Sequence, residues 1–319
     1  MKQLEIGKND AGQRLDKYLT KRLPNLPKSL LYKYIRKKRI KVNGKRAENS
    51  TRLQEGDLLT LYINDEFFER PEPRYDFLPA SRNLNILYED ENLLILDKKA
   101  GLLSHPDDHE YVDTLISRVK RYLYEKGEYD PEQEKSFAPA LINRIDRNTG
   151  GIVLAAKNAE ALRIMNQKMK DRELHKYYLC VVHGTPDPRE ATLEGYLVKN
   201  ESKNKVLVYE NPRPGAKAIR TKYRVLRSEQ GLSLVEVELL TGRTHQIRAH
   251  FASIGCPLMG DGKYGTNAQN RQRGGYKKQF LYSYKIAFDF VTDAGPLSYL
   301  DGKSFEAPNV WFAEQFPHY

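Results

Sequence analysis

The chain has 319 residues with 53 Lys and Arg against 42 Asp and Glu, and its net charge of +11 predicts a polyanionic partner, either nucleic acid or an anionic membrane. Its length predicts about two domains at roughly 150 residues each, and its two cysteines, Cys180 and Cys256, exclude a disulfide scaffold and a cysteine-based zinc site. The polar N-terminus shows no secretory signal and no apolar run approaches the ~18 residues of a membrane span, so we expect a cytoplasmic protein.

Residues 1–64 predict a small domain of two short helices and a small sheet. Apolar residues recur at helical spacing between Leu15 and Leu23, and a second helical pattern follows Ser29, a suitable N-cap. Asn43-Gly44 is typical of a tight hairpin turn, and the Leu-rich run Gly56–Ile63 predicts a strand.

Cations gather on the second helix and the hairpin after it. No Asp or Glu lies between Ser29 and Arg46, so all charges in this segment are positive. That favours phosphate binding over a merely solvated face. The segment resembles the S4-type RNA-binding domain in GQRLDKYL, IKVNGK and EGDLL, which fall between Gly12 and Leu59. The residues expected to contact RNA are Arg14, Lys33, Arg36, Lys37, Lys38, Arg39 and Lys41.

The second domain is predicted over residues 83–319. Residues 65–82 carry three prolines and no periodicity, which predicts an extended linker before it. Strands are predicted at 86–88, 93–96, 152–156, 177–182, 220–225 and 234–240, and helices at 159–170, capped by Asn158, and around 247–254. The fold class that follows is α+β: a mixed, mostly antiparallel sheet with flanking helices, without regular βαβ alternation.

The first candidate site is the loop Asn143–Gly151, directly before a buried strand. Asp146 lies between Arg144 and Arg147, whose charges would keep it ionised, as a nucleophile or a base requires. Taken alone this signal is weak, because Asp–Arg pairs are common on protein surfaces.

The second candidate site is Leu240–His250, where a strand ends and polar residues open a helix. Arg243 near that helix N-terminus suits an anion or a carboxylate. His245 and His250 are five residues apart and do not share a helix face, as two zinc ligands would. We therefore expect no metal.

Nucleotide-binding signatures are weak or missing. The G-x-G-x-x-G at 260–265 has no strand before it, which favours a loop over a dinucleotide site, and no P-loop or G-x-S-x-G occurs. The residues by themselves leave open RNA binding and a glycosyl-type reaction that uses a carboxylate.

Three motifs in order resemble the RluA-type pseudouridine synthase family. They are the loop around Asp146, HKYYLCVVHG at 175–184 and TGRTHQIRAHFASIGCPLMGDGKYG at 241–265, and residues 86–106 resemble the opening strand pair of the family. The resemblance implies a pseudouridine synthase domain that isomerises specific uridines in RNA, without metal or cofactor.

The same resemblance implies roles for single residues. Asp146 corresponds to the essential Asp that acts on the ribose as nucleophile or base, Arg243 to its ion-pair partner, and Tyr178 to the ring that stacks on the base. Arg144 corresponds to an Arg that fills the gap left by the flipped nucleotide. Further substrate contacts are expected from Arg147, Thr149, His245, Gln246 and Arg248.

The expected partner is structured RNA, with large-subunit rRNA favoured over tRNA, no membrane, and a monomeric enzyme. Two rival functions remain. A non-catalytic RNA-binding or ribosome-assembly factor is favoured by departures from the family pattern, Asn143 in place of His and Gly150 in place of Ser. A carboxylate glycosidase needs a second acid beside Asp146, and neither motif offers an obvious one.

Overall fold

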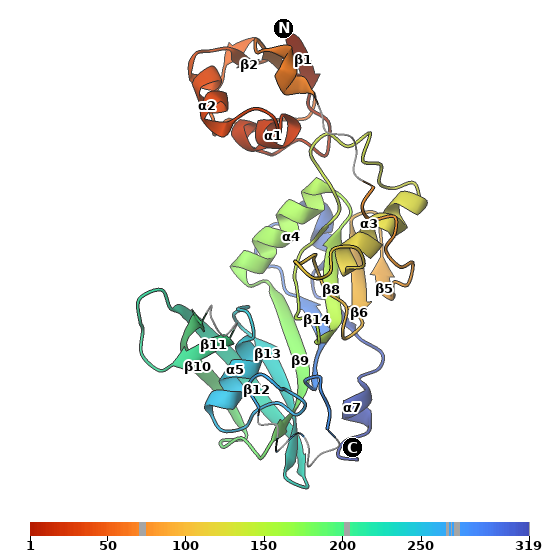
Figure 1. Ribbon diagram of the computed structural model, residues 1–319, viewed down its shortest axis with the longest axis vertical. Helices are drawn as coiled ribbons and strands as arrows, with labels where there is room; N and C mark the ends of the chain where they lie inside the picture. Colours follow the sequence, from red (N-terminus) through yellow and green to blue (C-terminus); the bar gives the residue numbers. More distant parts are fainter. Residues whose placement is uncertain (70–74, 201–204, 266–267, 269, 271–274, 319) are drawn as a thin grey trace.

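The computed structural model describes residues 1–69, 75–200, 205–265, 268, 270 and 275–318 (Figure 1). The N-terminal domain contains β1 Lys2–Glu5, α1 Leu15–Arg22, α2 Lys28–Arg36, β2 Ile40–Val42, β3 Lys45–Arg46, β4 Leu58–Leu61 and the 3₁₀ turn η1 Asp65–Phe68. Its strands form an antiparallel sheet in the order β1-β4-β2-β3. The predicted hairpin is confirmed, because Asn43 and Gly44 connect β2 and β3 with positive φ angles of 50° and 74°.

The start of α2 differs from the expectation. Ser29 is not its N-cap, because the helix begins at Lys28 and Pro27 occupies the capping position. Proline fits there, since a helix start needs no backbone N–H from that residue and the φ angle is already close to helical.

The second domain is built on one large sheet, as predicted. Its elements are β5 Ile86–Glu89, β6 Leu93–Lys98, α3 Leu115–Glu125, β7 Ala140–Leu141, β8 Gly150–Ala156, α4 Ala159–Asp171, β9 Leu174–His183, β10 Glu190–Asn200, β11 Lys205–Tyr209, β12 Lys217–Glu229, β13 Leu232–Leu239, α5 Gln246–Ser253, β14 Leu281–Phe288, η2 Gly295–Leu300, β15 Ser304–Glu306 and α7 Trp311–Glu314. The strand order is β11-β10-β12-β13-β9-β14-β8-β6-β5, with β15 beside β14 and β7 beside β8. Among the described strands only β8 and β14 pair in parallel.

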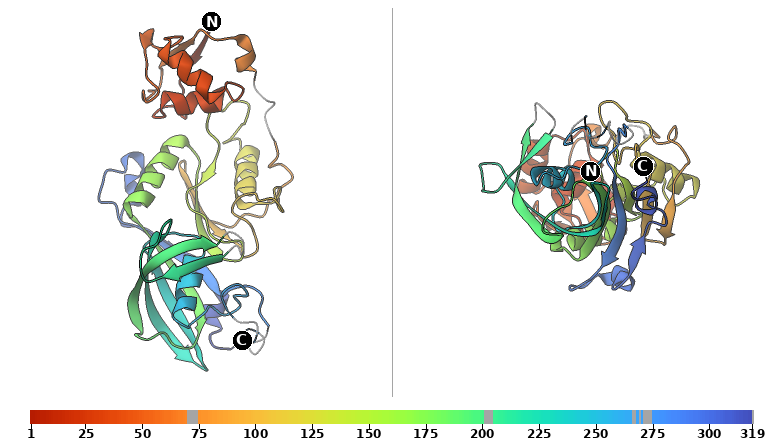
Figure 2. Two further views of the ribbon diagram at one scale, coloured as in Figure 1. Left: turned by 60° about the vertical axis from the view of Figure 1, so that its left-hand side comes forward. Right: turned by 90° about the horizontal axis from the view of Figure 1, so that it is seen from below.

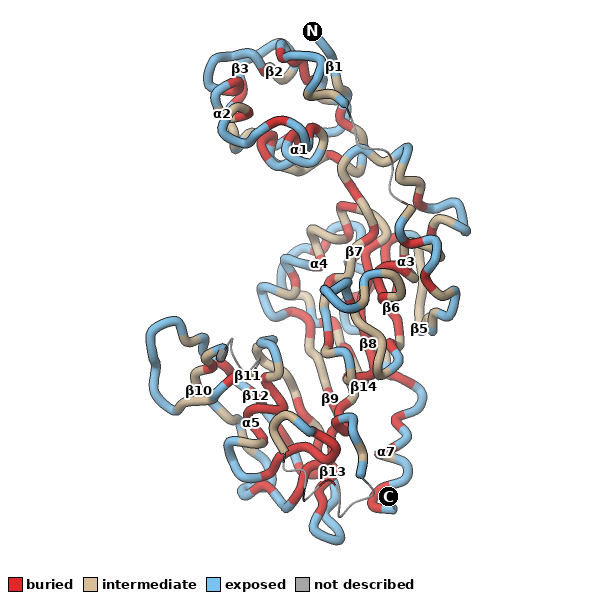
Figure 3. The backbone as a smooth tube through the Cα atoms, viewed as in Figure 1, coloured by how far each residue is buried: buried red, intermediate tan, exposed pale blue. Residues whose placement is uncertain are grey.

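Strand β8 is buried on both faces, which explains its unbroken apolar sequence. Ile152 and Leu154 belong to the core that α4 covers, whereas Val153 and Ala155 belong to the core that α3 covers. Figure 2 shows α3 and α4 on opposite sides of these strands, and Figure 3 shows β8 buried along its length. Asn158 caps α4 as predicted, its side chain accepting from Ala161 N at 2.8 Å.

The long strand β9 joins the two halves of the sheet. It pairs with β13 on one side and β14 on the other, so that Tyr178 lies between Val237 and Ser283. The loop that carries Asp146 precedes β8 in one half, and α5 packs on β11 and β12 in the other. Residues from both halves therefore meet beside β9.

Packing of the second domain begins within the predicted linker. Phe77 and Ala80 are fully buried, and the Phe77 ring packs edge-on against Tyr124 of α3. Pro71 and Pro73 lie outside the described residues. The predicted boundary at residue 83 stays a prediction.

The two domains touch through polar contacts in the turn between β1 and α1. Asn9 Nδ2 donates to Glu134 Oε1 at 2.8 Å, and Gln13 Nε2 donates to Ser136 Oγ at 2.8 Å. Arg163 of α4 donates to the carbonyl of Ala11. These contacts place the N-terminal domain at one end of the elongated molecule (Figure 1).

None of the described helices is long and apolar enough to cross a membrane.

Candidate active site

A cleft of about 650 Å³ opens where the Asp146 loop, β9 and the turn before α5 meet. Its volume is in the range of ligand pockets. The predicted site residues that line it are Arg144, Asp146, Thr149, Tyr178, Arg243, His245, Gln246 and Arg248. The other cations of its lining are Lys170, Arg172, Lys176 and Arg220, so the cleft is strongly basic.

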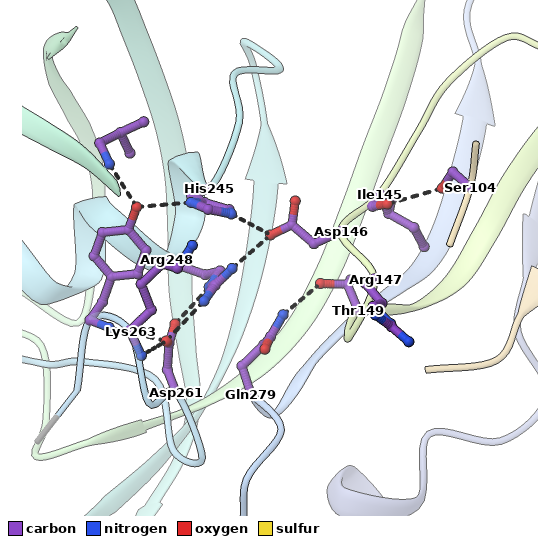
Figure 4. Close-up of polar contacts among 12 residues, drawn as sticks. Ser104, Ile145, Asp146, Arg147, Thr149, His245, Arg248, Asp261, Lys263 and Gln279 are labelled. Carbon is purple, nitrogen blue, oxygen red and sulfur yellow. Dashed lines mark hydrogen bonds and ion pairs between the residues drawn. The ribbon is translucent and has the colours of Figure 1, made fainter. Parts of the chain in front are cut away.

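Asp146 meets two basic side chains of α5 and the turn before it. Arg248 Nη1 donates to Asp146 Oδ2 at 3.0 Å, and His245 Nε2 lies 3.8 Å from the same oxygen (Figure 4). The Asp146 side chain is 27% exposed. Among the described residues no hydrogen bond reaches Oδ1, so this oxygen can face a substrate in the cleft.

The predicted ion pair between Arg243 and Asp146 is wrong, because Arg248 makes it. Arg243 precedes α5, is exposed on the rim of the cleft, and its backbone N–H donates to Gln246 Oε1 at 3.1 Å. Arg248 lies one turn later, on the inner side of α5, where its side chain is only 9% exposed. Which Arg of the motif points inward depends on where the helix begins, and the sequence did not settle that point.

Arg248 is held from behind by Asp261. Its Nε donates to Asp261 Oδ2 at 2.7 Å and its Nη2 to Oδ1 at 3.0 Å. The Asp261 side chain is completely buried. Burial by itself raises the pKa of this carboxyl, but Arg248 and the amides of Lys263 and Tyr264 outweigh it and hold the pKa below its usual value.

Sequence reasoning missed Asp261, which lies in the Gly-rich run identified as a loop. The only signal was an Asp enclosed by glycines at the end of the longest motif. The residue does not supply the second acid of a glycosidase, because both of its oxygens accept from Arg248 and none of its surface reaches the cleft.

Gln246 holds the turn before α5 together. Its Oε1 accepts from Thr241 Oγ1 at 2.8 Å and from Arg243 N at 3.1 Å, while Nε2 donates to Arg220 O and Thr221 Oγ1, each at 2.9 Å. The amide is thus fully used inside the protein. This favours a structural role over the predicted substrate contact.

The Asp146 loop is fixed by one backbone and one side-chain hydrogen bond at Thr149. Thr149 N donates to Asp146 O at 3.1 Å, and Gln279 Nε2 donates to the buried Thr149 Oγ1 at 3.3 Å. Arg147 turns away: its Nε donates to Gly101 O at 3.1 Å, and it is not among the described residues that line the cleft. The expected contributions of Arg147 to the charge of Asp146 and to substrate binding have no support in this geometry.

The two departures from the family pattern are accommodated locally. Asn143 Oδ1 accepts from Leu154 N at 2.8 Å and so ties the loop to β8. A Cβ on Gly150 would lie 2.5 Å from Tyr282 Cε2, so a serine there would collide with this ring. Neither change disturbs Asp146 or Arg248, which removes the argument for a non-catalytic protein from these positions.

Tyr178 lies at the base of the cleft on β9. Burial, with the nearby negative charge of Asp146, raises the pKa of its hydroxyl to about 12, so the side chain stays a neutral phenol. A neutral aromatic ring beside a carboxylate is compatible with stacking on a base, the role expected from the resemblance.

His250 is buried next to Thr221 of β12 and is not among the described residues that line the cleft. Thr221 Oγ1 lies 2.8 Å from its Nδ1, and Nε2 has no partner among the described residues. Across all the residues that the structure describes, there is no cluster of three His, Cys, Asp or Glu side chains that could hold a metal ion.

The titration of His250 predicts how stability depends on pH. Burial lowers its pKa to about 4, whereas unfolded histidine titrates near 6.5. The unfolded chain therefore binds the extra proton, and about 3 kcal/mol of stability, present above pH ~6.5, is lost as the pH falls towards 4. Urea unfolding of His250→Gln should show a shallower loss between these values. The matched control, His109→Gln at an exposed position, should lose stability with falling pH as the wild type does. An equal pH dependence of the unfolding free energy in all three proteins would contradict the prediction.

The N-terminal cations have different surroundings. Lys33, Arg36, Lys37, Lys38 and Arg39 are exposed, and Lys41 Nζ lies 5.7 Å from the Tyr62 ring centroid. Arg14 instead pairs with Asp16, donating at 3.0 and 2.9 Å, so it is partly committed inside the domain.

Comparison with known proteins gives matches in both domains. Residues 92–253 match the RNA pseudouridylate synthase family, and residues 13–59 match the S4 domain. Ribosomal large subunit pseudouridine synthase C of Vibrio cholerae is 32% identical over 291 residues, which cover 89% of this chain and 88% of that protein. An uncharacterized RNA pseudouridine synthase of Mycoplasma capricolum is 30% identical and covers 97% of this chain and 98% of its own.

A solved structure shares the fold. Human RNA pseudouridylate synthase domain containing 1 superposes with a TM-score of 0.55 at 22% identity, over 72% of this chain and 86% of that one.

Proposed function

The chain belongs to the family of RNA pseudouridylate synthases, which isomerise uridine in RNA to pseudouridine, and we propose that its substrate is the RNA of the large ribosomal subunit. Relatives from Vibrio cholerae and Haemophilus influenzae, 32% and 31% identical, carry the name ribosomal large subunit pseudouridine synthase C. The match to the S4 domain supports an RNA substrate, which this domain would bind at a distance from the reacting uridine.

The observation that supports this chemistry most strongly is the carboxylate of Asp146 in a basic cleft, with one oxygen paired to Arg248 and the other facing the cavity. In the reaction the N1–C1′ bond of uridine breaks and a C5–C1′ bond forms. C5 loses a proton and N1 gains one, so that substrate and product are isomers. We propose that Asp146 acts on the ribose, either by attack on C1′ or as a base.

Three other lining residues are suited to holding the nucleotide. A uridine stacked in structured RNA must leave its stack to reach Asp146, which costs a few kcal/mol. We propose that Tyr178 stacks on the flipped uracil and that Arg144, which is exposed beside the cleft, fills the gap left in the RNA. Arg243 at the rim is well placed for a phosphate.

The exposed cations of α2 and the following turn predict a strong salt dependence of RNA binding. Replacing Lys33, Arg36, Lys37 and Lys38 by Gln removes up to four phosphate contacts. We expect weaker binding and a log–log salt slope that is shallower by about 3. Filter binding of rRNA between low and moderate salt measures both quantities.

The matched control neutralises four cations that already pair with glutamates on the second domain: Arg82, Arg224, Arg227 and Lys285. Their charge is compensated, so the slope should change much less. Equal changes in both quadruple variants would show that α2 has no special role in RNA binding.

The substrate is tested by mapping pseudouridine in total RNA from cells with and without the gene. Loss of one or more positions in large-subunit rRNA, restored by the wild-type gene, is the expected result. Loss confined to tRNA would overturn the rRNA assignment. An unchanged map together with retained RNA binding would favour the non-catalytic factor.

A further inference from the structure

Tyr264 lies behind the Asp146 cleft and contacts both side chains that meet Asp146 Oδ2. Its hydroxyl is 2.9 Å from His245 Nδ1, and the two rings meet edge to face with centroids 5.6 Å apart. The face of the same phenol ring lies 5.2 Å from the guanidinium carbon of Arg248. Figure 4 shows His245 and Arg248 converging on Asp146.

The hydrogen bonds around Tyr264 favour one direction for its hydroxyl proton. The backbone N–H of Val206 donates to the Tyr264 hydroxyl oxygen at 2.9 Å, and an amide N–H can only donate. The hydroxyl proton is then available to His245 Nδ1. An imidazole nitrogen that accepts a hydrogen bond carries no proton, so the neutral ring carries its proton on Nε2, the atom that faces Asp146.

The surroundings keep the His245 ring neutral and the Tyr264 hydroxyl protonated. Burial, reinforced by Arg248 and Lys263 against the opposing charges of Asp146 and Asp261, lowers the pKa of His245 and keeps the ring neutral. Burial raises the pKa of Tyr264, so its hydroxyl keeps the proton that it donates.

We propose that Tyr264 is a positioning residue for the isomerisation: it holds His245 in the Nε2–H tautomer, so that His245 and Arg248 both present donors to Asp146 Oδ2 and Oδ1 is left to meet the ribose. The inference rests on Asp146 as the reacting carboxylate. The present distance of 3.8 Å is too long for a hydrogen bond. The proposal requires this distance to shorten when RNA binds, as catalytic contacts commonly do in complexes.

Two further observations fit this role. His245 has a φ angle of 55°, a left-handed conformation that a non-glycine residue keeps only when its surroundings hold it. Val206 belongs to β11, the outermost strand of the sheet on that side. The tautomer of the active-site histidine therefore depends on the docking of an edge strand, through Val206, Tyr264 and His245 in turn.

The direct test is ¹⁵N NMR of the free full-length protein, with His245→Gln used to assign the signals. We expect His245 to show a protonated Nε2 and an unprotonated Nδ1 at neutral pH. In Tyr264→Phe, which keeps the ring beside Arg248, this preference should be lost. A protonated Nδ1 in the wild-type protein would overturn the proposal.

Kinetics on total rRNA from a strain that lacks the gene supply the second readout. Tyr264→Phe should lower kcat about tenfold, the upper end of what one neutral hydrogen bond contributes, with little change in KM. The acid limb of the kcat profile should move to higher pH, because the neutral imidazole loses a donor while Asp146, Asp261, Arg248 and Lys263 remain.

The matched control is Tyr122→Phe on α3. It removes a hydroxyl that donates to Glu89 Oε2 at 2.7 Å, and it should leave kcat and its pH profile unchanged. An unchanged kcat in Tyr264→Phe, or an equal loss in both variants, would contradict the positioning role. The NMR result needs no RNA, so it stands independently of which RNA the enzyme modifies.

Discussion

Replacing Asp146 by Asn is expected to abolish pseudouridine formation while leaving the fold and RNA binding intact. Asn can still accept a hydrogen bond from Arg248, and the side chain is 27% exposed, so no buried charge is stranded. It offers the ribose neither a nucleophile nor a base. Loss of such a group lowers the rate by at least ~10³-fold.

The experiment combines single-turnover assays with complementation of the deletion strain. Asp146→Glu is the matched variant, because it keeps the charge that Arg248 needs but moves the carboxylate by one methylene. Both variants should bind rRNA with nearly wild-type affinity and melt near the wild-type Tm. Restoration of the missing pseudouridines by Asp146→Asn would remove Asp146 from the mechanism.

Replacing Arg248 by Met is expected to damage both activity and stability. Arg248 bridges Asp146 and the completely buried Asp261, so its removal leaves Asp261 as an uncompensated buried charge. Breaking a buried pair in this way costs about 3–5 kcal/mol. Activity should fall by a factor of at least ~10², because Asp146 loses the donor that orients it.

A second substitution separates the two effects. In Arg248→Met with Asp261→Asn, the buried charge is gone, and Asn can still accept from the amides of Lys263 and Tyr264. Urea unfolding should show most of the lost stability restored, while activity stays low. Arg243→Ala, on the exposed rim, should weaken RNA binding without lowering the unfolding free energy. Equal stability of Arg248→Met and wild type would contradict the assigned network.

Local patterns were sufficient for most of the elements that position the site. The hairpin at Asn43-Gly44, the buried strand before α4 and the Asn158 cap depend on turn chemistry, apolar runs and capping, all of which act over a few residues. The sequence also brought Asp146, Tyr178 and the turn before α5 into one site through the ordered motifs, and the structure places all three around the same cleft.

Local patterns failed where a contact joins segments far apart in the chain. Arg248 and Asp146 are 102 residues apart, and whether residue 243 or 248 reaches the carboxylate depends on the start of α5 and on how that helix packs. The sequence offered little indication of a role for Asp261, because that role depends on its contact with the guanidinium of Arg248. Gln246 looked like a substrate ligand but uses its whole amide to hold the turn.

The sequence by itself determined the net charge of +11, its concentration between Ser29 and Arg46 and the class of fold. These properties follow from composition and from short-range order along the chain, whereas Asp146 stood out as the candidate carboxylate only through the resemblance of the ordered motifs to the family. Only the tertiary structure decided the partner of Asp146, the buried acid behind that partner and the contact between Tyr264 and His245 Nδ1. Those features depend on distances between strands and helices, which the packing of the whole sheet sets and no single motif contains.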